Sequence, residues 1–287
     1  MPEQPPTDLT PLDIPALLRR YSLRPHKGLG QNFLVDPASL HKVMAAADVG
    51  AGDTVLEIGP GLGSLTRILA GIAQKVVAVE IDAGFLPPLR EVLTPYDNVT
   101  LVKGDILAVD LEELMGAGVY QVVANIPYNI TSLLIRKLLE SNHPPQHLTL
   151  TVQKEVAARL CAGPGDMSLL ALSVQVYGSP KIMANIPAGA FYPAPNVDSA
   201  VVQVERYPQP RVPVEDLSLF FRLAKAGFSQ KRKMLRNTLS AGMHWSKDWA
   251  EEALALAGID PTRRAETVSL EEWGRLVIVV KESGNEK

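Results

Sequence analysis

The segment Asn125-Ile126-Pro127-Tyr128 carries side chains that a simple turn does not need, directly after the apolar run 120–124. A proline alone can shape a turn, so the carboxamide and the aromatic ring beside it point to a ligand. The side-chain oxygen of Asn125 and the carbonyl of Ile126 can accept hydrogen bonds from an amino group, and Pro127 stiffens the turn. Tyr128 can stack on a flat ring. The segment predicts a clamp on an amine such as that of adenine, whose nitrogen becomes nucleophilic when acceptors hold its hydrogens.

Three carboxylates stand near the ends of the apolar runs that precede this segment. Glu57 comes just before the glycine-rich turn 59–63, Glu80 ends the next run, and Asp105 follows the third. A strand, a glycine-rich turn and a helix form a site for a nucleotide, because the glycines let the ligand approach the backbone and the helix offers free N–H groups. Glu80 can accept hydrogen bonds from both ribose hydroxyls. Asp105 can accept from the amino group of an adenine.

Two adenosine-bearing cofactors compete for this predicted site, a dinucleotide such as NAD and S-adenosylmethionine. Dinucleotide folds usually carry the spacing G-x-G-x-x-G, whereas this chain reads Gly59-x-Gly61-x-Gly63. Glu57 would repel a pyrophosphate, but its charge suits a cofactor with a sulfonium and an ammonium group. The residues favour S-adenosylmethionine, and the dinucleotide stays the alternative.

The hydrophobic pattern predicts a scaffold in which strands alternate with helices. Strands are expected at 54–58, 75–80, 99–103, 120–125 and 147–152, and helices at 65–72, 83–93, 131–140 and from about residue 154. Pro87 and Pro88 should disturb the second of these helices. This alternation predicts an α/β fold, a mostly parallel, Rossmann-like sheet with helices on both faces. Late strands at 181–186 and 199–205 should close it.

A tail and two domains are expected along the chain. Residues 1–15 hold five prolines and three acids, which predicts a flexible tail. Residues 16–207 should form the α/β domain with an N-terminal arm. The proline-rich break 207–213 then precedes a small α-helical domain at 214–287.

Composition narrows the class of protein. The single cysteine, Cys161, excludes an internal disulfide and favours a reducing compartment. The start of the chain lacks the pattern of a signal peptide, and no apolar run approaches the roughly 20 residues of a membrane span. We therefore expect a soluble, cytoplasmic protein, with a monomer as the default. The five histidines are scattered, so we expect no metal site.

Basic residues gather in two segments although the net charge is −3. The segments 14–35 and 217–247 contain no acid; the first includes Lys27, and the second holds Lys231, Arg232, Lys233 and Arg236. Such local patches indicate an anionic partner such as a nucleic acid. The alternative is a solvated helix face with no partner.

Several motifs together resemble the family of small-subunit ribosomal RNA adenine dimethyltransferases. They run in order over most of the chain: 27–34 (KGLGQNFL), 56–63 (LEIGPGLG), 79–82 (VEID), 104–105 (GD), 125–128 (NIPY), 153–159 (QKEVAAR), 191–199 (FYPAPNVDS) and 228–239 (FSQKRKMLRNTL). Other methyltransferases share single motifs. The first, the seventh and the last are specific in combination.

The resemblance implies S-adenosylmethionine as the cofactor, in a Rossmann-like methyltransferase domain, and a role for each matching residue. Asn32 and Leu34 would close over the cofactor, and Gly59 and Gly61 would contact its methionine part. The remaining cofactor contacts would come from Glu80 on the ribose, Asp105 on the adenine amine, Ile81 and Ile106 on the two faces of the adenine, and Asn125 at the transferred methyl group.

The substrate side follows from the same resemblance. The family converts two adjacent adenosines in the 3′-terminal hairpin of small-subunit (16S) rRNA to N6,N6-dimethyladenosine, late in assembly of the 30S subunit. Ile126 departs from the commoner leucine but offers the same carbonyl. Phe191 is expected either as a second aromatic wall for the target base or as a loop anchor over the core. Phosphate contacts would come from a helix that starts at the basic residues: Lys231, Arg232, Lys233 and Arg236.

Two other functions remain open from the sequence. One is a large-subunit rRNA adenine methyltransferase of the macrolide-resistance type, which shares the fold and the Asn-x-x-Tyr/Phe turn. The other is a non-catalytic ribosome-assembly or RNA-binding factor that has kept the fold. The intact Glu80, Asp105 and Asn125 argue against a loss of chemistry.

Overall fold

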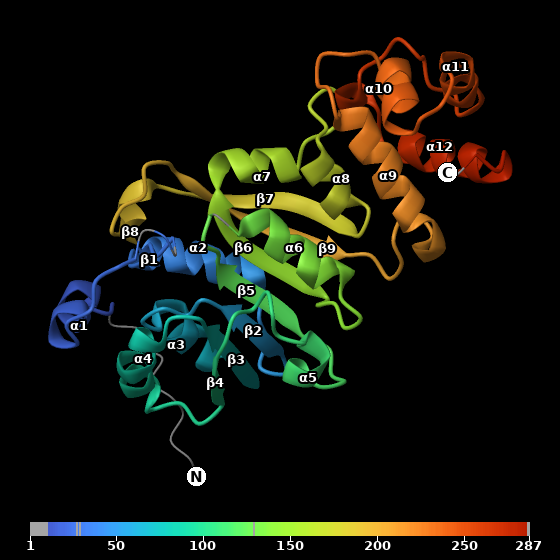
Figure 1. The fold of residues 1–287 in the computed structure, drawn as a ribbon. Helices are drawn as coiled ribbons and strands as arrows, with labels where there is room; N and C mark the ends of the chain where they lie inside the picture. Colours follow the sequence, from blue (N-terminus) through green and yellow to red (C-terminus); the bar gives the residue numbers. More distant parts are fainter. Residues whose placement is uncertain (1–10, 27, 29, 129, 286–287) are drawn as a thin grey trace. The chain divides into compact units, whose positions relative to one another are not determined.

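A computed structural model describes residues 11–26, 28, 30–128 and 130–285 of the chain (Figure 1). It divides into two compact units. The first contains the chain up to Ala157 together with Lys181–Arg206, and the second contains Ala158–Pro180 and the chain from Tyr207 onward. The expected boundary near residue 207 falls where the second unit resumes. The expected domains did not include the transfer of Ala158–Pro180 to the second unit.

The first unit is built around a mostly parallel sheet, which confirms the α/β expectation. The strand order is β4-β3-β2-β5-β6-β9-β7, formed by β2 (Thr54–Ile58), β3 (Lys75–Glu80), β4 (Val99–Lys103), β5 (Gln121–Asn125), β6 (His147–Gln153), β7 (Gly178–Ile186) and β9 (Ser199–Arg206). The strands from β4 to β6 pair in parallel, and β9 runs antiparallel to β6. The carboxyl ends of β2, β3 and β5 therefore meet at one edge of the sheet.

Helices cover the sheet of the first unit, as Figure 1 shows. They are α1 (Ile14–Arg20), α2 (Pro37–Ala47), α3 (Ser64–Ala70), α4 (Leu86–Leu93), α5 (Leu111–Met115) and α6 (Thr131–Glu140), with α7 (Lys154–Leu160) beginning after β6. Helix α2 packs on β6 and β9, and α3 packs on β3. Aliphatic side chains from these elements make the core, which includes Val43, Val55, Leu69, Val76 and Val123.

Most expected elements are confirmed, and the differences have local causes. Helix α6 spans the expected residues, and the five early strands match to within one residue at each end. Helix α3 ends at Ala70 with Gly71 as its C-cap, so Ile72 lies beyond it and is exposed. The expected helix at 83–93 is divided into a 3-10 turn at Ala83–Phe85 and α4 from Leu86, and Pro87 and Pro88 lie in the first turn of α4, where N–H groups have no intrahelical partner.

The expected tail is too long by two residues in the described part of the chain. Residues 1–10 lie outside the described residues. Helix α1 begins at Ile14, because the side chain of Asp13 accepts a hydrogen bond from the N–H of Ala16 at 2.9 Å. Ile14 is fully buried with Leu18 and Phe85, so this start of the arm belongs to the folded unit.

A second, two-stranded sheet was not predicted. Strand β1 (Phe33–Leu34) pairs antiparallel with β8 (Phe191–Tyr192), so the N-terminal arm is joined to a segment about 160 residues later. Phe33 lies opposite Tyr192, and Leu34 lies opposite Phe191. Two residues are too few to give a periodic signal, so only the tertiary contact reveals this pair.

The second unit is helical. It contains α8 (Leu169–Gln175), α9 (Leu217–Phe228), α10 (Leu235–Gly242), α11 (Lys247–Leu256) and α12 (Leu270–Glu282), and α9 contacts α8, α10 and α12. Its core holds Trp273, which is fully buried and stacks on Phe228 with ring centroids 6.1 Å apart. Gly227 is required there, because a Cβ at that position would lie 2.5 Å from the Trp273 ring.

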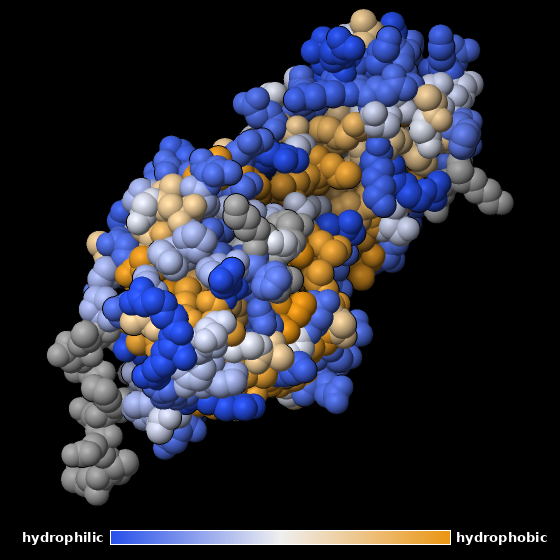
Figure 2. Space-filling view, turned by 60° about the vertical axis from the view of Figure 1, so that its left-hand side comes forward, coloured by the Kyte–Doolittle hydropathy of each residue, from blue (hydrophilic) through white to orange (hydrophobic). Residues whose placement is uncertain are grey.

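Apolar side chains also reach the surface of both units. Figure 2 shows hydrophobic residues between hydrophilic ones on the face it draws. The exposed large apolar residues include Leu133, Ile182 and Val197 in the first unit and Val214 and Leu256 in the second. No helix in the described part of the chain is long and apolar enough to span a membrane.

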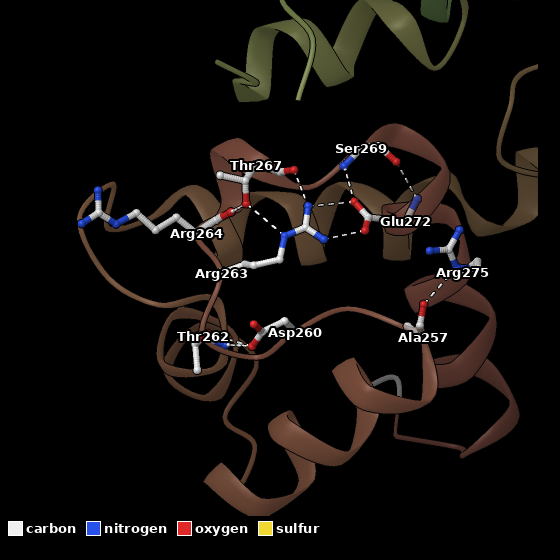
Figure 3. Close-up of polar contacts among 9 residues, drawn as sticks. All are labelled: Ala257, Asp260, Thr262, Arg263, Arg264, Thr267, Ser269, Glu272 and Arg275. Carbon is white, nitrogen blue, oxygen red and sulfur yellow. Dashed lines mark hydrogen bonds and ion pairs between the residues drawn. The ribbon is translucent and has the colours of Figure 1, made fainter. Parts of the chain in front are cut away.

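A charged network holds the loop between α11 and α12 (Figure 3). Arg263 donates to both carboxylate oxygens of Glu272, at 2.6 and 3.1 Å, and also to the hydroxyl and carbonyl of Thr267. Glu272 in turn accepts from the N–H of Ser269 at 2.7 Å and completes a capping box at the start of α12. The same loop supports α10, because the N–H of Leu235 donates to the carbonyl of Arg263 at 2.7 Å.

Replacing Arg263 with methionine should destabilise the second unit by about 2–3 kcal/mol, since it removes charge-assisted hydrogen bonds and leaves Glu272 without its cation. Arg264→Met is the matched control: Arg264 is more exposed, pairs only at 3.8 Å with Glu266, and points away from the network in Figure 3. The control should change stability by less than about 0.5 kcal/mol. All three tryptophans belong to the second unit, so urea unfolding followed by tryptophan fluorescence reports on that unit alone.

The stabilisation by Arg263 should also depend on pH. Burial alone would raise the pKa of Glu272, but the hydrogen bonds from Arg263 and from Ser269 outweigh it and leave that pKa lowered. A lowered pKa means that the stabilisation is present at neutral pH and is lost as the pH falls through the folded-state pKa, below the ordinary value of 4.5. The difference in the free energy of unfolding between the wild type and Arg263→Met should therefore become smaller at acidic pH. An equal loss of stability in the two variants at pH 7 would contradict this account.

Candidate active site

A pocket lies in the first unit at the carboxyl ends of β2, β3 and β5. The residues that line it come from the N-terminal arm, the glycine-rich turn and these strand ends: Gly30, Gln31, Asn32, Phe33, Leu34, Glu57, Gly59, Pro60, Gly61, Leu62, Ser64, Leu65, Glu80, Ile81, Phe85, Asn125 and Pro127. Among the expected cofactor residues, the pocket gathers Asn32, Leu34, Gly59, Gly61, Glu80, Ile81 and Asn125.

The glycine-rich turn needs glycine for backbone reasons and for close packing. Gly59, Gly61 and Gly63 have φ angles of 68°, 58° and 89°, which other residues rarely adopt. A Cβ at Gly61 would lie 2.8 Å from the ring of Phe33, so the turn can only pass under the arm if this residue is glycine. Gly63 is the N-cap of α3, and the first two residues of that helix, Ser64 and Leu65, line the pocket.

Glu80 supports the turn from the neighbouring strand. Its carboxylate accepts from the N–H of Gly61 at 3.0 Å and from the N–H of Asp82 at 2.8 Å. The side chain is buried, and burial raises its pKa although these N–H groups act in the opposite direction. Each carboxylate oxygen can accept more than one hydrogen bond, so Glu80 keeps capacity for the hydroxyls of a ribose.

Glu57 is the unusual carboxylate of the pocket. It is only 2% exposed, and its Oε2 has no hydrogen-bond partner in the described structure. Burial raises its pKa to about 8, the nearby charge of Glu80 adds to the shift, and the neighbouring Thr66 hydroxyl opposes it without making a hydrogen bond. An unpaired buried carboxylate is costly, and a cation bound beside it would remove that cost. The residues of the pocket therefore fit a ligand with an ammonium group.

The N-terminal arm is held over the pocket by hydrogen bonds that sequence reasoning missed. Gln31 donates from Nε2 to Asp82 at 2.9 Å, and its Oε1 accepts from the N–H of His26 at 2.7 Å. Asn125 donates from Nδ2 to the carbonyl of Asn32 at 2.8 Å. Gln31 lies within the quoted Gly-Gln-Asn-Phe-Leu motif, but no spacing rule pairs it with Asp82. Lys27, also in that motif, lies outside the described residues.

The described residues of the turn after β5 are held by hydrogen bonds to neighbouring segments. Because Nδ2 of Asn125 is engaged with the arm, its Oδ1 is the atom left to accept from a ligand among the described contacts. Ile126 has a buried side chain and donates its N–H to Thr151 at 3.2 Å, which anchors the turn. The hydroxyl of Tyr128 lies 2.7 Å from that of Ser199, and burial raises the pKa of Tyr128.

Asp105 and Ile106 do not line this pocket in the described structure. They follow β4, whose end pairs with the end of β3 through Lys103 and Glu80. Asp105 is exposed and accepts from the N–H of Leu107 at 2.9 Å, while the side chain of Ile106 is buried. Their contact with an adenine ring stays a prediction. Ile81, the other residue expected against the adenine ring, is 51% exposed and lines the pocket.

Phe191 is not where the first expectation placed it. Its side chain is 4% exposed and packs in the aliphatic core with Leu34 and Val43, so it does not offer a free wall for a base. The alternative expectation, a loop anchor, describes it better. Strand alternation explains the result: Phe191 and its partner Leu34 face the core, whereas Tyr192 is 41% exposed.

The basic residues of the second unit do not start a helix as expected. Lys231, Arg232 and Lys233 form an exposed turn between α9 and α10, which begins at Leu235. No acidic partner contacts these three residues in the described part of the chain. Arg236 lies in α10 and pairs with Glu251 at 2.7 Å. We call residues Lys231–Lys233 the basic turn.

No group of three or more His, Cys, Asp or Glu side chains that could hold a metal ion occurs among the described residues.

This chain is similar to known proteins over most of its length. A family model described as "Ribosomal RNA adenine dimethylase" matches residues 23–282.

Relatives and solved structures agree with this match. The "Ribosomal RNA small subunit methyltransferase A" of Dehalococcoides mccartyi strain CBDB1 is 46% identical over 265 residues, covering 91% of this chain and 90% of that protein. A dimethyladenosine transferase from Plasmodium falciparum is similar in structure, with a TM-score of 0.75, 25% identity, and coverage of 88% and 98%. The 23S rRNA methyltransferase ErmE has a TM-score of 0.71, 27% identity, and coverage of 87% and 100%.

The pKa of Glu57 predicts a pH-dependent affinity for a ligand with an ammonium group. With a pKa of about 8, Glu57 is mostly protonated at pH 7, whereas the ammonium favours the ionised form. Affinity for S-adenosylhomocysteine should therefore rise about five- to tenfold from pH 6.5 to 7.5, with release of a proton on binding. Isothermal titration calorimetry in buffers of different ionisation enthalpy measures both quantities.

Glu57→Gln keeps the shape of the side chain and removes its titration. This variant should bind more weakly and should lose both the pH slope and the proton release. Glu113→Gln, an exposed carboxylate outside the pocket, is the control and should behave like the wild type. An unchanged pH slope in Glu57→Gln would show that another group titrates.

Proposed function

We propose that this chain, which belongs to the ribosomal RNA adenine dimethylase family, uses the pocket at the carboxyl ends of β2, β3 and β5 to methylate adenosines of small-subunit rRNA. It is an S-adenosylmethionine-dependent rRNA adenine dimethyltransferase. The observation that carries the site is the meeting of Glu57, Glu80 and Asn125 at one edge of the sheet. The targets that we propose are N6 of two adjacent adenosines in the 3′-terminal hairpin, within an assembling small subunit.

The residues of the pocket divide between the two ends of the cofactor. Gly59 and Gly61 leave room for the methionine part, and the carboxylate of Glu57, which lines the pocket, would accept from the ammonium. Glu80 has capacity left for the ribose hydroxyls. The cofactor supplies an electrophilic methyl group on a sulfonium.

Recognition of the adenine of the cofactor would come from the next strand ends. We assign Ile81 and Ile106 to the two faces of the ring and Asp105 to its amino group. The exposed position of Asp105 and its place after β4 support this assignment. Asn32 and Leu34 would cover the bound cofactor, since the arm that carries them is tied to Asp82 and Asn125.

Activation of the target amine falls to the turn after β5. The nitrogen of an adenine amino group is a poor nucleophile, because its lone pair is delocalised into the ring. Oδ1 of Asn125 and the carbonyl of Ile126 can accept its two hydrogens, which favours a pyramidal nitrogen with an available lone pair. Tyr128 would stack on the base. The proton can leave after methyl transfer, so the site needs no strong general base, and positioning provides most of the catalysis.

The RNA must present an unstacked adenosine to this site, which fits the way proteins usually recognise RNA. The basic turn supplies three exposed cations that are in none of the ion pairs found in the described structure, and we assign it to phosphate contacts. Arg236 forms an ion pair with Glu251, so its contribution to RNA binding should be smaller.

The two alternative functions receive less support. The 23S rRNA methyltransferase ErmE is 27% identical, whereas the small-subunit methyltransferase of D. mccartyi is 46% identical. A purely non-catalytic assembly factor would have no use for an unpaired Glu57 or for the open acceptor of Asn125.

Asn125→Ala tests the role of the turn. We expect kcat to fall by at least about 100-fold, the size of effect seen when one preorganised hydrogen-bonding group is removed from an active site. The assay combines tritiated S-adenosylmethionine with small subunits that lack the modification, followed by digestion and identification of the labelled nucleoside. Label should appear in dimethyladenosine with the wild type only.

Cofactor affinity is the control for Asn125→Ala, because this residue also ties down the arm. The affinity for the cofactor should change by less than about tenfold in this variant, which is the loss expected from one hydrogen bond. Tight subunit binding by the wild type without any label in its RNA would exclude the catalytic function. Label in large-subunit RNA instead would favour the macrolide-resistance type.

Replacing Lys231, Arg232 and Lys233 together by alanine should lower the affinity for RNA and reduce the slope of log K against log[salt] by about 2–3, since each phosphate contact contributes roughly 0.7–0.9. Filter binding at several salt concentrations measures this slope. The charge-matched control replaces three exposed cations of the first unit, Lys75, Arg90 and Lys181. Equal slopes for the two triple variants would assign the effect to net charge rather than to the basic turn.

A further inference from the structure

Lys137 makes contacts that the proposed reaction does not yet use. It lies on α6, the helix that starts three residues after Tyr128. Its ammonium donates to the carbonyls of Leu107 and Val109 at 2.7 and 2.6 Å. These two residues belong to the segment after β4 that begins with Asp105. A single side chain thus joins the helix behind the target-amine turn to the segment assigned to the adenine of the cofactor.

Residues 105–109 form a short turn that is held at both ends. At its start, the side chain of Asp105 accepts from the N–H of Leu107 at 2.9 Å, and its carbonyl accepts from Ala108 and Val109 at 2.8 and 3.0 Å. At its end, the carbonyls of Leu107 and Val109 both accept from the ammonium of Lys137, whose positive charge strengthens the two hydrogen bonds.

The surroundings of Lys137 suit a fixed cation. The side chain is half-buried, and the hollow beside it is lined by Asp110, Glu112, Glu140 and His143. Two charge-assisted hydrogen bonds to neutral carbonyls orient the ammonium more strongly than a single surface ion pair would. Gly104, on the other side of the turn, is close-packed as well, since a Cβ there would lie 3.3 Å from Val109.

We propose that Lys137 is a positioning residue for recognition of the cofactor's adenine: it holds the 105–109 turn so that Asp105 faces the amino group and Ile106 the ring. The inference rests on the proposed function, because it needs Asp105 to contact that amino group. On this inference, α6, which follows the turn at the target amine, also sets the specificity of the cofactor site. The target-base half and the cofactor half of the site would then share one rigid helix.

The test compares two product-like ligands that differ only at the base, S-adenosylhomocysteine and S-inosylhomocysteine. The second has a carbonyl in place of the amino group, so the ratio of the two dissociation constants isolates recognition of that edge. We expect the wild type to prefer the adenine ligand by at least about tenfold, because Asp105 accepts from an amino group and repels a carbonyl oxygen. Calorimetry on the full chain measures both constants.

Lys137→Met keeps the apolar stem and removes the donors. It should weaken the adenine ligand about 5- to 20-fold and the hypoxanthine ligand less than about twofold, so the preference falls. Arg136→Met, one position earlier on the same helix, is the control; Arg136 pairs with Glu140 on the surface, and its loss should leave the ratio unchanged. Lys137→Gln keeps a neutral NH₂ group as a donor, so its effect should lie between those of the wild type and Lys137→Met. It replaces the methionine variant if that variant does not fold.

A double-mutant cycle with Asp105→Ala shows whether Lys137 acts through Asp105. In the Asp105→Ala background, Lys137→Met should cost less than about twofold, because the group that it positions is already gone. Equal weakening of both ligands by Lys137→Met would overturn the inference, since it would describe a general structural role. Full additivity in the cycle would overturn it as well.

Failure of the inference and failure of the proposed function give different results. If the wild type binds neither ligand, the assignment of the pocket to S-adenosylmethionine is wrong. If it binds both without preference, or if only Asp105→Ala removes the preference, the pocket assignment stands and the role of Lys137 is wrong.

Discussion

The parallel pairing of β2 with both β3 and β5 is the constraint on which the pocket depends. In a parallel sheet all carboxyl ends lie at one edge, so residues that are far apart in sequence meet there without further design. Glu57, Glu80 and Asn125 are brought together in this way. The glycine-rich turn between β2 and α3 follows from the same geometry, because the chain must reverse sharply at the point where the ligand approaches the backbone.

The arm before β2 turns this open edge into a covered pocket. Its hydrogen bonds to Asp82 and from Asn125, and the pairing of β1 with β8, hold it in place. Each of these contacts involves a residue that we assign to the reaction, or a residue next to one in the sequence. Burial raises the pKa of Glu57, and the arm lines the same pocket through residues such as Asn32 and Phe33.

The second unit contains both a structural ion pair and an exposed group of cations. The loop between α11 and α12 is tied down by Arg263 and Glu272, and it supports the first residues of α10. The basic turn before α10 is exposed, and none of the ion pairs found in the described chain involves its three residues. A structural ion pair and a set of unpaired cations thus occur in the same small unit, and the role in RNA binding that we propose for the cations remains a prediction.

The sequence by itself determined the family, the α/β class, the chemistry and most residues of the pocket. Periodicity locates the strands, a glycine with positive φ has few substitutes, and the motifs are local in the chain, so each of these signals is readable one segment at a time. The assignments of individual residues to their ligands remain predictions, including those of the residues that line the pocket.

Only the tertiary structure decided which side chains are free to act. Phe191 is held in the core by its pairing with Leu34, the basic turn is not a helix, Gln31 reaches Asp82, and Ala158–Pro180 belongs with the helical unit. The reason is physical: burial, cross-strand pairing and long-range hydrogen bonds depend on which segments meet in space. Two-residue strands and single side-chain contacts such as that of Lys137 leave no periodic trace in the sequence.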